Sequence, residues 1–175
     1  SSGNLDLVPE GTHTLEAELS VSLSEDVSSR FFGSWSKVED EIDKVTPPNQ
    51  YQNLPGGLTV TSTEAELNAA LNKWRFRLAY ALTLASYSSV GGPYAGRKQY
   101  EFPPHMLKSN ISYKLTKTIT ATGSTEVYSK RPRTDWAPDT GLEDGKPFAL
   151  AHLAFYAKDL GKRQNTQVGL SIRNL

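Results

Sequence analysis

Apolar and polar residues alternate in four stretches of the chain, and this period of two predicts β-strands. Residues 14–23 place leucine, alanine and valine on one side and polar residues on the other. Residues 75–86 alternate bulky residues with smaller or polar ones, which predicts a central strand whose alanine side lets a helix approach closely. Residues 110–121 and 168–172 predict two further strands, and residues 58–61 predict a short one.

Two other stretches repeat apolar residues at steps of three and four, which predicts amphipathic helices. The first helix covers 31–45 and ends because two prolines follow it. The second begins at Thr63, which forms a capping box with Glu66. A third helix is predicted over 147–160 between a proline and a glycine, although its 148–157 stretch also fits a buried strand.

These elements predict an α+β fold, in which an antiparallel β-sheet packs against two or three helices in a single compact domain. The length of 175 residues leaves no room for two full-sized domains. Residues 1–12 are expected to be a flexible N-terminus, with a cloning remnant at 1–3, and residues 13–175 form the domain. No apolar run approaches the roughly 18 residues of a membrane-spanning helix, so any membrane contact is expected to be peripheral.

Charge is divided unevenly along the chain although the formal net charge is zero. Residues 1–72 hold three Lys/Arg against twelve Asp/Glu, whereas residues 73–133 hold eleven against two. Such parts can join copies of the chain, or can present a basic face to an anionic surface. The alternative is that the two parts neutralise each other within one subunit. An acidic self-association face is predicted on the outer side of the first helix, at Glu39, Asp40, Glu41 and Asp43.

Two basic segments are candidate contact sites. The apolar residues of a glycine-rich loop lie beside two cations, a combination that suits an anionic lipid interface and equally an ordinary protein contact. These residues are Val90, Pro93, Tyr94, Arg97 and Lys98. A second cluster, in a long loop predicted over 129–147, is typical of a nucleic-acid or nuclear-import patch, with a solvated loop as the alternative. It consists of Lys130, Arg131 and Arg133.

No motif in the sequence indicates a catalytic centre. Cysteine is absent, which excludes disulfides, thiolate nucleophiles and cysteine-ligated metals. His13, His105 and His152 each stand without a partner at metal-ligand spacing. The loop 91–98 has the glycines of a phosphate-binding loop but lacks its lysine and its hydroxyl residue. We therefore predict no enzyme activity, no cofactor and no metal site.

The order of the elements resembles a known family over about residues 13–173. A strand, a helix with a Phe-rich start and an acidic middle, the strand 75–88 running into a Gly/Pro loop, a further strand, a late helix and a final strand are similar to the core domain of rhabdovirus matrix proteins. The resemblance implies an apolar membrane-seeking loop at Val90, Pro93 and Tyr94. The segment 47–51 is one residue too long for the Pro-Pro-x-Tyr budding motif of that family, and no lysine-rich arm is present.

If the resemblance holds, the chain is a non-enzymatic virion protein that self-associates and acts in virus assembly and budding. It would bridge the viral nucleoprotein and the inner face of the envelope membrane, and would occur in the virion, the host cytoplasm and, through the basic patch, the host nucleus. The alternative is a jelly-roll coat protein of a small virus, which needs about eight strands. An enzyme of unknown class is the third hypothesis.

Overall fold

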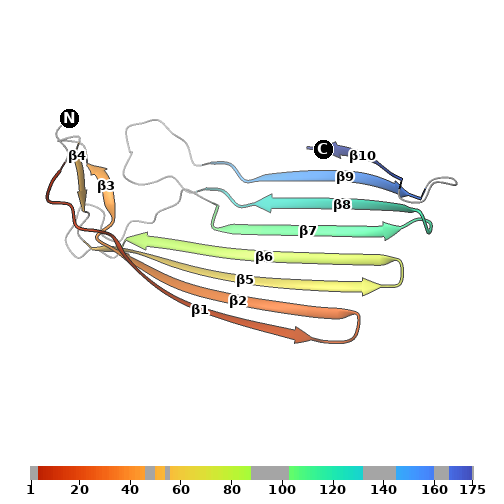
Figure 1. Cartoon of the computed structure of the whole chain (residues 1–175), viewed down its shortest axis with the longest axis horizontal. Helices are drawn as coiled ribbons and strands as arrows, with labels where there is room; N and C mark the ends of the chain where they lie inside the picture. Colours follow the sequence, from red (N-terminus) through yellow and green to blue (C-terminus); the bar gives the residue numbers. More distant parts are fainter. Residues whose placement is uncertain are drawn as a thin grey trace.

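The computed structural model describes residues 4–45, 50–53, 56–87, 103–131, 145–159 and 166–174. Every regular element in these ranges is a β-strand (Figure 1). Eight strands form one antiparallel sheet in the order β1-β2-β5-β6-β7-β8-β9-β10. They are β1 (Gly11–Ser22), β2 (Val27–Glu39), β5 (Gly57–Leu71), β6 (Trp74–Tyr87), β7 (His105–Lys114), β8 (Ile119–Tyr128), β9 (Phe148–Lys158) and β10 (Gln167–Arg173).

The sheet is a meander with two unlike ends (Figure 1). At one end, here called the turn end, short connections at 23–26, 72–73 and 115–118 join neighbouring strands. Asn72 has a φ of 54° in the tightest of them, a left-handed conformation that asparagine tolerates. At the opposite end, the loop end, the connections are long. One of them carries a separate hairpin of β3 (Ile42–Val45) and β4 (Gln50–Asn53).

All three predicted helices are wrong, and so is the predicted α+β fold, because the described chain is all-β. The 31–45 stretch lies in β2 and β3, with a left-handed residue, Asp40, between them. The capping-box pair Thr63 and Glu66 lies inside β5, on opposite faces of the strand. The third stretch forms β9, which confirms the strand alternative for residues 148–157.

The apolar residues of β2 have an apparent helical spacing because they lie on both faces of the strand. Phe31 and Trp35 lie on the same face with Gly33 between them, and this glycine hides the period of two. Phe32 and Val38 point to the other face, which supplies apparent steps of three. A strand with apolar residues on both faces therefore imitates a helix when it is judged by spacing alone.

The alternating stretches did form strands. Residues 14–23 fall almost entirely within β1, residues 75–86 within β6 and residues 168–172 within β10. The predicted strand 110–121 is wrong as one element, because residues 115–118 make a turn between β7 and β8. Among the residues that the structure describes, no helix packs against the alanine side of β6.

The described part of the chain has almost no buried core. Only Leu58 and Ala85 count as buried apolar residues, at 9% and 3% exposure. The chain exposes 12454 Å², whereas a monomeric globular protein of 19.3 kDa exposes about 8,500 Å². A sheet with this much uncovered surface needs another medium or another layer against it.

Candidate functional site

One face of the sheet is apolar across all eight strands. Cross-strand partners share a face, so the pairing registers assign each residue to one side. Eighteen large hydrophobic residues that are at least a third exposed lie on this side, which we call the apolar face. They are Leu15, Leu19, Phe31, Trp35, Leu67, Leu71, Trp74, Phe76, Leu78, Tyr80, Leu84, Leu107, Ile111, Val127, Phe155, Val168, Leu170 and Ile172.

The apolar face has the height of a bilayer's hydrocarbon layer. On β6 it extends from Trp74 to Leu84. These ten residue steps measure roughly 34 Å along a strand. With the tilt of about 40° that strands have in membrane barrels, this length corresponds to roughly 26 Å along the membrane normal. The apolar band of such barrels is about 25 Å tall.

Aromatic rings gather where the apolar face reaches the turn end. Trp74 stacks on Phe76 with ring centroids 5.6 Å apart and lies 4.3 Å from the ring of Tyr113. His105 begins β7 at the loop end, and its Nδ1 lies 2.7 Å from the hydroxyl oxygen of Tyr80. Aromatic and partly polar rings of this kind are typical of membrane–water interfaces.

Two hydroxyl residues in the middle strands of the apolar face are paired with each other. Ser109 and Thr125 face one another on β7 and β8, and their hydroxyl oxygens are 2.7 Å apart. One hydroxyl donates to the other, so each has a hydrogen-bond partner within the sheet. This pairing lowers the free-energy cost of placing both residues against hydrocarbon.

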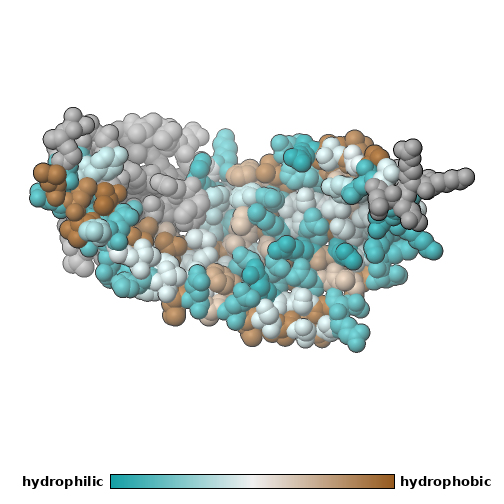
Figure 2. Space-filling view, viewed as in Figure 1, coloured by the Kyte–Doolittle hydropathy of each residue, from teal (hydrophilic) through white to brown (hydrophobic). Residues whose placement is uncertain are grey.

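The opposite face, here called the polar face, carries the charged and hydroxyl side chains. Figure 2 shows hydrophilic residues gathered over the middle strands of the sheet. Hydroxyl pairs bridge neighbouring strands at Ser62 and Thr83, 3.1 Å apart, and at Ser112 and Thr122, also 3.1 Å apart. The two faces therefore differ in chemistry over the whole width of the sheet.

A network of ion pairs centred on Arg30 crosses four strands of the polar face. Arg30 Nη2 lies 2.7 Å from Glu64 Oε1 and 3.8 Å from Glu66 Oε2, and Nη1 lies 3.5 Å from Glu18. Arg77 Nη2 donates to the same Glu66 oxygen at 2.7 Å, and Asn68 donates to the other at 2.8 Å. The Glu66 side chain is only 10% exposed, so its charge is held by these three donors.

The charge division seen in the sequence lies across this face. Strands β1, β2 and β5 place four carboxylates and one arginine on it, namely Glu16, Glu18, Glu64, Glu66 and Arg30. Strands β6 to β10 place six cations and one carboxylate there, namely Arg75, Arg77, Lys108, Lys114, Lys158, Arg173 and Glu126. The Arg77–Glu66 contact pairs a cation of the basic half with a carboxylate of the acidic half. This contact supports the alternative in which the two parts neutralise each other within one subunit.

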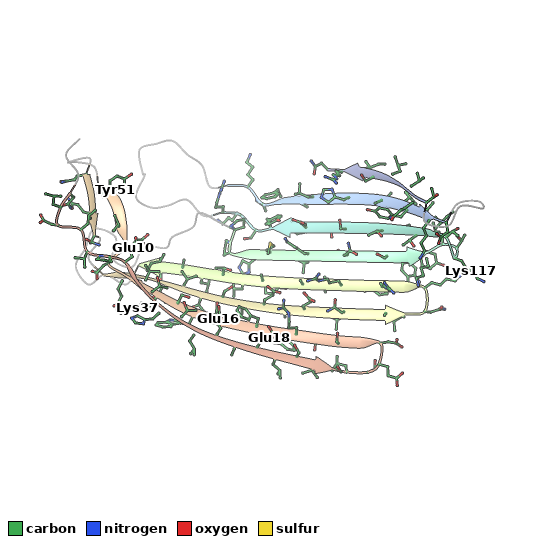
Figure 3. The ribbon with its side chains drawn as sticks, in the orientation of Figure 1. Glu10, Glu16, Glu18, Lys37, Tyr51 and Lys117 are labelled. Carbon is green, nitrogen blue, oxygen red and sulfur yellow. The ribbon has the colours of Figure 1, made fainter. Side chains whose placement is uncertain are left out.

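The predicted acidic face is not on a helix. Glu39 ends β2, Asp40 adopts a left-handed conformation with φ 55°, and Asp43 lies in β3. Glu41 lies between these strands and is partly buried. Lys37 Nζ donates to Glu39 at 2.5 Å, and this hydrogen bond holds the pKa of Glu39 below its ordinary value. Lys37 and Glu39 lie at the loop end, beyond the apolar band, as Figure 3 shows for Lys37.

The predicted contact residues fall largely outside the described residues. This holds for the whole apolar-loop set, Val90, Pro93, Tyr94, Arg97 and Lys98, and for Arg133. Lys130 and Arg131 are exposed beyond the loop end of β8, and Arg131 forms a backbone bridge with Gly145. The structure therefore leaves the basic patch and the apolar loop as predictions.

Within the described ranges, no group of three or more His, Asp or Glu side chains is placed to hold a metal ion. The three histidines lie on different strands, β1, β7 and β9. The described residues also include no helix that is long and apolar enough to cross a membrane.

Sequence reasoning missed the Arg30 network. Two of its carboxylates, Glu64 and Glu66, are two residues apart, and Arg77 has the same spacing from Arg75, which is the spacing of one strand face. In β6 this spacing could be recognised, because the alternation of bulky and smaller residues there predicted a strand. In β5 the same signal was masked, because Glu66 also fits a capping box.

Comparisons with known proteins connect this sheet with solved structures of larger chains. No protein-family model and no curated protein sequence matches the chain. The copper transporter OprC matches over 97% of this chain and 26% of its own, with a TM-score of 0.77 and 16% identity. The siderophore receptor PirA from Acinetobacter baumannii matches over 97% and 28%, with a TM-score of 0.68 and 14% identity. This chain thus spans about a quarter of each, and what it shares with them is the fold.

The resemblance to rhabdovirus matrix proteins is wrong, because the helices that carried it are strands and the fold matches a transporter and a receptor. The matrix function in virus assembly and budding, and the placement in virion and host cell, are wrong for the same reason. The jelly-roll alternative is also wrong, since the eight strands form a single meander. Self-association, the contacts with nucleoprotein, anionic lipid and nucleic acid, and the lack of enzyme activity stay predictions.

Proposed function

We propose that this chain is part of the wall of a bacterial outer-membrane transport barrel of the TonB-dependent type. Its apolar face contacts lipid, and its polar face lines the interior. The observation that carries the proposal is the apolar face itself, which extends over all eight strands while the described residues form almost no buried core. In water, an exposed apolar surface of this extent would drive aggregation.

The connections support the same arrangement. Outer-membrane barrels have short turns on the periplasmic side and longer loops on the extracellular side. The sheet has the same asymmetry between its turn end and its loop end. Neighbouring strands pair over seven to fourteen residues, and backbone pairing of this kind is what a lipid-facing segment requires. The turn end is therefore assigned to the periplasm and the loop end to the cell exterior.

The absence of cysteine allows a direct test by spin labelling. Single cysteines at Phe76, Leu78 and Leu82 on the apolar face are compared with matched cysteines at Arg77, Ala79 and Ala81 on the polar face, in the full-length protein in lipid vesicles. We expect the first set to collide with lipid-soluble oxygen and the second with a water-soluble nickel chelate. The accessibilities should alternate with a period of two along β6.

The two sets of positions share one strand, so label chemistry and distance from the membrane surface are nearly matched. Equal access of the nickel chelate to both sets would contradict the proposed membrane contact. Greater access of the nickel chelate to the label at Leu78 than to the label at Ala79 would also contradict it.

A further inference from the structure

Four cations converge on a cavity at the turn end of the polar face. The cavity has a volume of about 390 Å³. Lys73 lies in the β5–β6 turn, Arg75 on β6, Lys114 on β7 and Lys158 on β9. The remaining lining residues are uncharged and mostly hydroxyl or amide groups, namely Asn72, Ser112, Thr118, Thr120, Tyr156 and Gln167.

Among the described residues, no carboxylate lines this cavity and no ion pair involves any of its four cations. Elsewhere on the polar face, Arg30, Arg77 and Lys108 each approach a glutamate, whereas Arg173 has no ion pair among the described residues. Like charges gathered on one side of a sheet repel each other and destabilise it. A bound anion would remove that repulsion.

The number of cations in the lining favours an anion with more than one negative charge. Lys114 and Lys158 lie on β7 and β9, two strands apart, and Thr120 of the intervening β8 pairs with Lys114 and with Tyr156. Two strand spacings amount to about 10 Å. Among the described residues, four cations and no carboxylate line the cavity, so a ligand with several negative charges balances them better than a single carboxylate does. A ligand with two anionic groups can also span the distance between the two strands.

We infer that this cavity binds a small polyanion of the polyphosphate or polycarboxylate type, held by Lys114 and Lys158 at its two ends and by Lys73 and Arg75 on one side. The inference rests on the polar face alone and does not need the sheet to lie in a membrane. In the proposed barrel, the site opens to the interior near the periplasmic end.

The test titrates the full-length folded protein in detergent with pyrophosphate, citrate and orthophosphate, and measures binding by calorimetry. We expect saturable binding of pyrophosphate or citrate that weakens as salt rises. The double variant Lys114→Gln/Lys158→Gln should bind at least tenfold more weakly. Lys108→Gln, which removes a polar-face cation paired with Glu126, should bind as the parent does.

Binding of pyrophosphate alone identifies a phosphate ligand, and binding of both identifies a general polyanion site; either supports the inference. Equal affinity for orthophosphate would overturn the requirement for two anionic groups. Absence of saturable binding, or equal affinity of parent and double variant, would overturn the site. Circular dichroism checks that the double variant is folded, and because lysine repulsion is relieved, we expect its thermal midpoint to be unchanged or higher.

Discussion

Replacement of Leu78 by arginine is expected to lower the free energy of unfolding of the membrane-inserted protein by about 2–4 kcal/mol. Leu78 lies near the middle of the apolar band on β6, and its side chain is 45% exposed on the apolar face. A guanidinium at that depth would have to leave water for hydrocarbon, or deform the bilayer to stay hydrated. Denaturant unfolding of the protein in lipid vesicles, followed by tryptophan fluorescence, measures the change.

Ala79→Arg is the matched control, one residue away on the polar face. Its cross-strand neighbours are Glu66 and Lys108, so the new cation would lie beside one carboxylate and one cation in a polar setting. We expect a change of less than about 1 kcal/mol. The lipid-facing assignment of Leu78 would be refuted if the two arginines destabilised the protein equally, or if Ala79→Arg were the more harmful.

The strands that could be recognised in the sequence are those in which each residue differs in polarity or in size from its neighbours on the opposite face. In β1, aliphatic residues such as Leu15 and Leu19 alternate with Glu16 and Glu18. In β6, bulky residues alternate with alanines and arginines. A period of two is then the only repeat that fits. These strands could be predicted from their residues alone.

The helices were predicted where one strand face is interrupted. β2 has Gly33 in its apolar row, and β5 has Thr63 and Thr61 in its own. An apolar row that no tightly packed layer covers tolerates small and hydroxyl residues, because a hydroxyl can bond across the sheet. The row then loses its alternation, and residues three or four apart suggest a helix.

The uneven division of charge can be recognised in the sequence, but where the charged side chains lie on the sheet depends on the register of strand pairing. Arg30 and Glu64 are 34 residues apart, and only the β2–β5 pairing brings them to 2.7 Å. The four cations of the turn-end cavity come from three strands and a turn, so no spacing along the chain reveals them. Sites made by cross-strand neighbours can be predicted only after the order of the strands is known.

Replacement of Arg30 by methionine is expected to destabilise the protein by about 1–2 kcal/mol. Removing one partner of a buried ion pair costs about 3–5 kcal/mol, but the Arg30 side chain is 37% exposed and water screens the charges that remain. Glu64 would lose its ion-pair partner among the described residues, whereas Glu66 would keep Arg77 and Asn68. The free energy of unfolding is measured in the same vesicles as for Leu78→Arg.

A double-mutant cycle separates the ion pair from the loss of side-chain packing. Glu64→Gln removes the charge that Arg30→Met leaves without a partner, so the double variant should be less destabilised than the sum of the single variants. Lys108→Met is the control, because its contact with Glu126 is 3.9 Å long and its side chain is 47% exposed. We expect that change to stay within about 0.5 kcal/mol. If Arg30→Met were equally harmless, or if the cycle showed no coupling, the network would not contribute to the stability of the polar face.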